Sequence, residues 1–271
     1  MVRSLWTAAS GMTTQQTNVD IISNNLANIN TTGYKKESAE FKSLLYQTIQ
    51  EQAYDNNGDP KPSGIQVGLG VRNSSITSLF TQGNLNETGN DLDFAIEGKG
   101  FFMVQAVDGS IAYTRNGSFN IQNGVNGPTL SNNDGHPILD TNLMPIVIDD
   151  IYNPSEITVN DDGELCYPDA VTGNNIPIGV KMGIAQFNNP SGLIKMSGSL
   201  LRESEASGTA RMEADDPMLK TSKLRQRYLE GSNVQAVDEI VNLIVAQRAY
   251  EMNSKIITAT DEMLQQANNL R

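Results

Sequence analysis

The side chains that could carry out chemistry in this chain are few and scattered. Three groups of neighbouring carboxylates stand out: Asp91/Asp93, Asp149/Asp150 and Asp161/Asp162. Such pairs can serve as the acid and base of a glycosidase or as calcium ligands. None has the spacing of an EF-hand loop, and all lie in turn-rich segments, where aspartate is favoured for local hydrogen bonding. The pattern favours a structural role, and a peptidoglycan-hydrolysing enzyme is the alternative that would need such a pair.

Other reactive groups are too few to form a site. His136 is the only histidine and Cys166 the only cysteine, so a zinc site built from these ligand types is excluded. No nucleophile-elbow sequence accompanies the histidine, and a lone cysteine forms no intramolecular disulfide. The run Gly98-Lys99-Gly100 lacks the spacing of a phosphate-binding loop and precedes a strand-like segment. We therefore predict no catalytic residue, no cofactor and no bound metal.

The charge balance of the chain limits the kinds of partner that we expect it to bind. The chain of 271 residues has 19 basic and 31 acidic side chains, a net charge of −12. A protein that binds nucleic acid electrostatically needs a basic stripe, so no nucleic-acid partner is expected. No stretch approaches the ~18 apolar residues of a membrane span. Thr13, Thr14, Gln15 and Gln16 interrupt any apolar run near the start, so no cleaved signal peptide is expected.

The strongest regularity is an apolar residue at every seventh position near both ends. In the N-terminal segment, predicted to be helical over 4–30, these residues are Leu5, Met12, Val19 and Leu26, with Ile22 and Ile29 on the adjoining stripe. In the C-terminal segment, predicted to be helical from 233 to about 270, they are Leu243, Tyr250, Ile257 and Leu264, with Ile240 alongside. A spacing of seven places side chains on one stripe of a helix, which can then pair with another helix.

These eleven residues form the predicted assembly interface. Each stripe spans only about four heptads and cannot bury itself, so we expect the ends to pair with each other, with other copies, or both. The alternative is an ordinary helical core within a monomeric domain.

The middle of the chain has the texture of β-structure. Short apolar runs alternate with four Asn-Gly and three Asp-Gly pairs, which suit hairpin turns. Between the N-terminal helix and this region, apolar residues at helical spacing predict a short helix over 37–50, followed by a turn-rich loop over 55–64. The predicted class is α+β, with N- and C-terminal coiled-coil helices pairing together and a central, mostly antiparallel β domain.

Four segments follow from these patterns. They are an N-terminal helix of an inner domain (1–36), a helix/loop insertion and linker (37–70), a central β domain (71–228) and a C-terminal helix of the inner domain (229–271).

Several blocks of the sequence resemble the bacterial flagellar basal-body rod and hook proteins, an axial protein family. The blocks are residues 4–12 (SLWTAASGM), 22–35 (ISNNLANINTTGYK), 82–85 (QGNL), 92–102 (LDFAIEGKGFF), 113–119 (YTRNGSF), 247–255 (QRAYEMNSK) and 261–264 (DEML). Within the family, the chain most resembles the distal rod proteins. The residues that favour them are 44–49 (LLYQTI), 63–68 (SGIQVG) and 229–234 (LEGSNV).

The resemblance implies a structural subunit that polymerises helically into a hollow drive shaft and transmits torque from motor to hook. It places the protein in the periplasmic rod of the basal body, after export through the flagellar type III apparatus without a cleaved signal peptide. The implied partners are further copies of the chain, the proximal rod and hook proteins, the export apparatus and, where an outer membrane is present, the P- and L-ring proteins. A proximal rod or hook protein is the near alternative, and a secreted cell-wall-binding module is the alternative of a different class.

The resemblance also implies a rod-stiffening segment between residues 46 and 64. The residues that we assign to this segment are Tyr46, Asn57, Pro60, Pro62 and Gly64. Proline restricts the backbone, and the segment is too polar to form a core alone. A solvated surface loop is the alternative.

Overall fold

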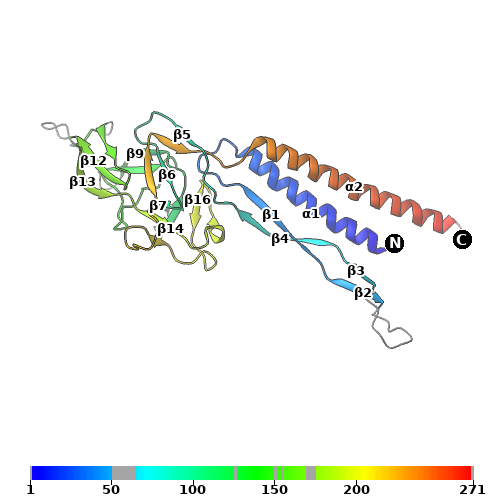
Figure 1. Ribbon diagram of the computed structural model, residues 1–271. Helices are drawn as coiled ribbons and strands as arrows, with labels where there is room; N and C mark the ends of the chain where they lie inside the picture. The colour runs from blue at the N-terminus through cyan, green and yellow to red at the C-terminus, as the bar shows by residue number, and fades with distance from the viewer. Residues whose placement is uncertain are drawn as a thin grey trace. The chain divides into compact units, whose positions relative to one another are not determined.

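The computed structural model describes residues 2–50, 65–124, 127–148, 152–153, 156–168 and 175–269. The chain forms two compact units (Figure 1). One, the helical unit, comprises Met1–Ala27, Glu37–Thr77 and Gln235–Arg271. The other, the β unit, comprises Asn28–Lys36 and Ser78–Val234.

Two long helices dominate the helical unit. Helix α1 (Val2–Ala27) and helix α2 (Ala236–Asn269) lie side by side in Figure 1. They are antiparallel, since Gly11 lies against Asn253 and Asn25 against Glu239. The prediction of a helix at each end is confirmed. Helix α2 begins three residues later than expected, at a point where the carbonyl of Gln235 accepts the first helical hydrogen bond from the amide of Glu239, at 3.1 Å.

Two pairs of strands complete the helical unit and correct one prediction. Strand β1 (Glu37–Ser43) pairs with β4 (Val71–Ser78), and β2 (Tyr46–Gln50) pairs antiparallel with β3 (Ile65–Gly68). We call these four strands the ribbon. The helix predicted over 37–50 is therefore wrong. The spacing of its apolar residues also suits strands, and the strands that pair with them lie far along the chain, where local periodicity gives no signal of them.

The ribbon is anchored to the first helix by side-chain hydrogen bonds. The amide of Val71 donates to the hydroxyl of Ser10 at 3.3 Å, and Nδ2 of Asn73 donates to the hydroxyl of Thr17 at 2.8 Å. Both contacts run from β4 to the polar side of α1. Two hydroxyl side chains of this helix, those of Ser10 and Thr17, thus contact a strand.

The β unit is built from antiparallel strands. Its six-stranded sheet has the order β15 (Ile194–Lys195), β16 (Leu200–Arg202), β8 (Ile111–Thr114), β7 (Phe101–Gln105), β14 (Ile184–Gln186) and β17 (Arg211–Met212). A three-stranded sheet comprises β11 (Thr158–Val159), β12 (Glu164–Pro168) and β13 (Asn175–Lys181). The pairs are β9 (Phe119–Gly124) with β10 (Gly127–Asn132), β6 (Phe94–Glu97) with β18 (Lys223–Gln226), and β5 (Leu85–Glu87) with β19 (Tyr228–Glu230).

Glycine turns connect some of these strands as the sequence predicts. Gly109 has φ 78° between β7 and β8, and Gly163 has φ 84° between β11 and β12. Both follow an aspartate, and both occupy the left-handed region that other residues avoid. The prediction of a central antiparallel β domain is confirmed.

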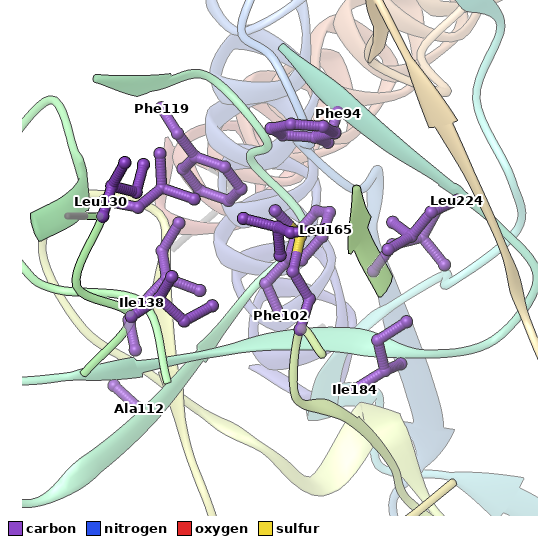
Figure 2. Packing of buried hydrophobic residues seen from close by; sticks show 14 of the residues in the cluster. Phe94, Phe102, Ala112, Phe119, Leu130, Ile138, Leu165, Ile184 and Leu224 are labelled. Atoms are coloured by element: carbon purple, nitrogen blue, oxygen red, sulfur yellow. The ribbon is translucent and has the colours of Figure 1, made fainter. Parts of the chain in front are cut away.

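A single aromatic-rich cluster forms the main core of the β unit (Figure 2). The ring of Phe119 lies 5.1 Å from that of Phe102 and 6.1 Å from that of Phe94, centroid to centroid. Leucines and isoleucines from distant strands surround them: Leu130, Ile138, Leu165, Ile184 and Leu224. The core therefore needs nearly the whole β unit to be in place.

Replacing Phe119 by alanine should lower the free energy of unfolding of the β unit by about 3–5 kcal/mol, because a fully buried ring is lost and a cavity remains. Urea unfolding followed by circular dichroism measures this. The control is Val107→Ala, in a turn where the side chain is 93% exposed, with an expected change below about 0.5 kcal/mol. Equal effects of the two variants would contradict the central role of Phe119.

Candidate assembly interface

Helix α2 turns a line of small and polar side chains toward α1. Glu239, Ala246 and Thr260 are only 1–2% exposed, and together with Asn253 they recur at every seventh position. On the opposing helix, a Cβ placed on Gly11 would lie 2.8 Å from Nδ2 of Asn253. The two backbones approach closely there, and only glycine leaves room for the asparagine.

A buried asparagine fixes one end of this helix pair. Asn25, 1% exposed, donates from Nδ2 to a carboxylate oxygen of Glu239 at 3.2 Å and to the carbonyl of Glu37 at 2.9 Å. Its Oδ1 accepts from the amide of Glu37, also at 2.9 Å. One amide thus joins α1, α2 and the start of β1, and it specifies the register between the helices.

The predicted interface residues mostly lie beside this line. Ile22 is buried, whereas Ile240 and Tyr250 are 46% and 42% exposed. The remaining predicted residues are half-buried: Leu5, Met12, Val19, Leu26, Ile29, Leu243, Ile257 and Leu264. Sequence reasoning missed the small and polar line itself, because three of its four residues are polar and the fourth is a small alanine. The seven-residue spacing of these four residues was the signal that could have found it. The assignment of these eleven residues to an assembly interface stays a prediction.

A second apolar surface lies on the opposite side of α2. We call it the outer face, and it comprises Val237, Val241, Ile244, Val245 and Met252, with exposures of 73, 53, 45, 61 and 59%. At about 100° per residue, its first three residues point away from the line that contacts α1. Burial of each such side chain would contribute roughly 1.5–3 kcal/mol. A set of exposed apolar side chains on one side of a helix is typical of a protein–protein interface.

The ribbon also exposes apolar side chains. Leu45, Tyr46 and Ile49 are 81, 61 and 55% exposed, and Ile65 on the paired strand is 53% exposed. Tyr46 pairs with Gly68, where a Cβ would lie 3.4 Å from the tyrosine ring. The other predicted stiffening positions, Asn57, Pro60, Pro62 and Gly64, lie outside the described residues.

A buried ion cluster joins distant segments of the β unit. The carboxylate of Glu230, whose side chain is 0% exposed, accepts from Nζ of Lys35 at 2.6 Å and from Nη1 of Arg115 at 3.2 Å. It also accepts from the amide of Gly83 at 2.9 Å. Burial lowers the pKa of Lys35, and Glu230 opposes that shift; the same two effects act on the pKa of Arg115. We refer to Lys35, Arg115 and Glu230 as the ion cluster.

Three of the aspartates singled out from the sequence, Asp91, Asp93 and Asp161, have local partners. Asp91 pairs with Arg227 at 2.6 Å and Asp161 with Lys223 at 3.3 Å, both at the surface. Asp93 accepts from the side-chain amide of Asn90 at 3.2 Å. Asp149 and Asp150 lie outside the described residues.

Within the ranges that the structure describes, no group of three or more histidine, cysteine or acidic side chains is placed to hold a metal ion. No described helix has the length and apolar character needed to cross a membrane.

Family models match three parts of the chain. Residues 5–35 match a model described as flagella basal body rod protein, residues 95–167 the flagellar hook protein FlgE/F/G D1 domain, and residues 225–270 the flagellar basal body rod FlgEFG protein C-terminal. The first and last matches cover most of α1 and α2, and the middle one lies in the β unit.

Relatives match over the full length. The flagellar basal-body rod protein FlgG of Agrobacterium fabrum is 44% identical over 265 residues, 97% of both chains. Proteins of the same name from Borreliella burgdorferi and Bacillus subtilis are 41% and 38% identical and are covered over 99% and 100% of their lengths. The chain therefore belongs to the flagellar basal-body rod protein family. It is a structural protein of the flagellar basal body and not an enzyme.

Replacing Glu230 by glutamine should lower the free energy of unfolding of the β unit by about 3–5 kcal/mol, because Lys35 and Arg115 are left as buried cations without a carboxylate. Chemical denaturation measures the change. The matched control is Glu97→Gln, which breaks a half-exposed pair with Arg225 and should cost less than about 1 kcal/mol. A loss for Glu230→Gln no larger than the control's would show that the cluster adds nothing to stability.

Proposed function

We propose that this chain is a subunit of the distal rod that polymerises helically into a hollow shaft and transmits torque from motor to hook. The observation that carries the proposal is the outer face of α2, which leaves five apolar side chains exposed although the helix is already paired with α1. A second contact surface on the same helix is what a subunit needs if it is to touch neighbours on more than one side.

The proposed shaft has an inner tube of terminal helices. In each copy α1 and α2 pair as a short coiled coil, and the outer face of α2 packs against helices of the next copy. The contact is heterologous, so repeating it without closure produces an open helical array. In this assembly, segments 1–36 and 229–271 form the inner domain, and segment 71–228 forms an outer layer.

The proposed stiffening element is segment 46–64 of the insertion 37–70, of which β2 in the ribbon is the described part. Leu45, just before β2, and Tyr46 and Ile49 within it are exposed, so a neighbouring copy can cover them. A ribbon wedged between copies would resist their sliding and keep the shaft straight. The anchoring of β4 to Ser10 and Thr17 supports this role, because force on the ribbon would reach α1 directly.

The remaining parts of the proposal follow from the family. The chain would be exported through the flagellar type III apparatus without a cleaved signal peptide and would lie in the periplasmic rod. Its neighbours would be the proximal rod and hook proteins at the ends of the shaft, with P- and L-ring proteins around it where an outer membrane exists.

Replacing Val241 by aspartate should block polymerisation while leaving the monomer folded. The side chain is 53% exposed in the single chain, so the charge becomes costly only when a neighbour buries it. Sedimentation and electron microscopy measure assembly, and circular dichroism measures folding. Asn242→Asp is the control, because it adds the same charge at the next position, which points away from the outer face. Normal filaments from the Val241 variant would remove the outer face from the interface.

Deleting residues 52–61 should give rods that are curved or bendable, because the proposed wedge between copies is shortened. Electron microscopy of isolated rods measures their curvature. Tyr46→Ser tests the same idea without changing the chain length and should give a smaller increase in curvature. Straight, normal rods from the deletion would identify the segment as a solvated loop.

A further inference from the structure

The ion cluster contains two positive charges and only one negative charge. Two cations, Lys35 and Arg115, share the single carboxylate of Glu230, and all three side chains are at most 5% exposed. Arg115 donates from Nη2 to the carbonyl of Gly98 at 2.8 Å, but its Nε is buried and has no hydrogen-bond partner among the described residues. A buried cation without a counter-charge and a buried donor without an acceptor both destabilise the free protein.

Glu213 supplies some counter-charge to Arg115 through space, but no hydrogen bond joins the two side chains among the described contacts. Its carboxylate accepts from the amide and hydroxyl of Ser222, both at 2.7 Å. It also accepts from Nε2 of Gln186 at 2.7 Å. None of these hydrogen bonds involves the Nε of Arg115.

A pocket of about 310 Å³ opens beside this unbalanced group. Three phenylalanines line it: Phe80 and Phe187 meet Phe101 edge-on, with centroids 5.5 and 5.7 Å apart. Lys99 also lines the pocket, is exposed, and makes no ion pair with any described residue. None of the lining residues is acidic. The pocket thus combines an apolar wall with two cations and no anion.

We propose that this pocket binds a carboxylate on a short apolar stem, and that the carboxylate belongs to an acidic side chain of a second copy of this chain. The methylene groups would pack between the phenylalanine rings, and the carboxylate would lie near Lys99 and Arg115 and offset the excess charge. A second copy is the favoured source because the chain has 31 acidic side chains against 19 basic ones. This source rests on the proposed polymerisation, whereas the carboxylate specificity does not.

The specificity is tested on the purified full chain with 3-phenylpropionate and its neutral analogue 3-phenylpropanamide. We expect saturable binding of the acid, seen as shifts of phenylalanine ring signals in NMR spectra, and roughly tenfold weaker binding of the amide, since it lacks the charge that the cluster attracts. Equal affinity for both compounds, or no saturable binding of the acid, would overturn the proposal.

Two variants locate the site. Lys99→Met should weaken binding of the acid several-fold without loss of fold, since Lys99 makes no ion pair with the residues that the structure describes. Lys42→Met, at an exposed lysine on β1, is the matched control and should leave affinity unchanged. Asn188→Asp places a carboxylate in the pocket and should abolish binding and raise the melting temperature; Arg211 already donates to this side chain and would keep it in place. Unchanged affinity in both Lys99→Met and Asn188→Asp would exclude this pocket.

The source is tested by carbodiimide coupling in filaments assembled from a mixture of isotopically light and heavy chains. We expect the amine of Lys99 to be joined to an aspartate or glutamate of a different copy, in mixed-isotope cross-linked peptides. Coupling only within one copy, or none in intact filaments, would overturn the second copy as the source. If the wild-type chain forms no filaments, polymerisation itself fails, and binding of 3-phenylpropionate to the monomer still decides the specificity.

Discussion

Two helices that pair with each other have only one line of contact, and this constraint governs the helical unit. In this chain the line is occupied by small and polar residues, among them Gly11, Ala246 and Asn253, which allow a close approach. The larger apolar side chains of α2 are therefore left at the sides and on the outer face. A helix that contacts its partner through polar residues and exposes apolar residues to solvent is stabilised when further protein covers the exposed face.

The ion cluster links distant segments of the β unit through buried charges. Lys35 and Glu230 are separated by 195 positions in the sequence, and their pairing ties the segment after α1 to the last strand before α2. Buried charges add little net stability compared with apolar packing, but they penalise wrong arrangements severely. Both segments are thereby held within the β unit.

The sequence predicted what depends on local pattern. Seven-residue repeats located both terminal helices, and Asp-Gly pairs located turns such as those at Gly109 and Gly163. The helix predicted over 37–50 was wrong, because a few apolar residues at helical spacing suit a ribbon equally well. The contact line through Glu239 and Thr260 was missed because its repeat is polar. The ion cluster was out of reach of the sequence, since nothing local indicates that three residues so distant will meet.

The surfaces of helix α2 that remain uncovered limit how copies of the chain can assemble. Its polar repeat, which includes Glu239 and Ala246, is used within the chain, whereas the apolar heptad that includes Leu243 is only half covered and the outer face is open. A simple dimer formed through the outer face would close that surface and stop growth. The heptad beside the contact line would still need another neighbour, so a helix with uncovered apolar residues in more than one direction favours a continuous array. That is the arrangement which a tube of repeated subunits provides.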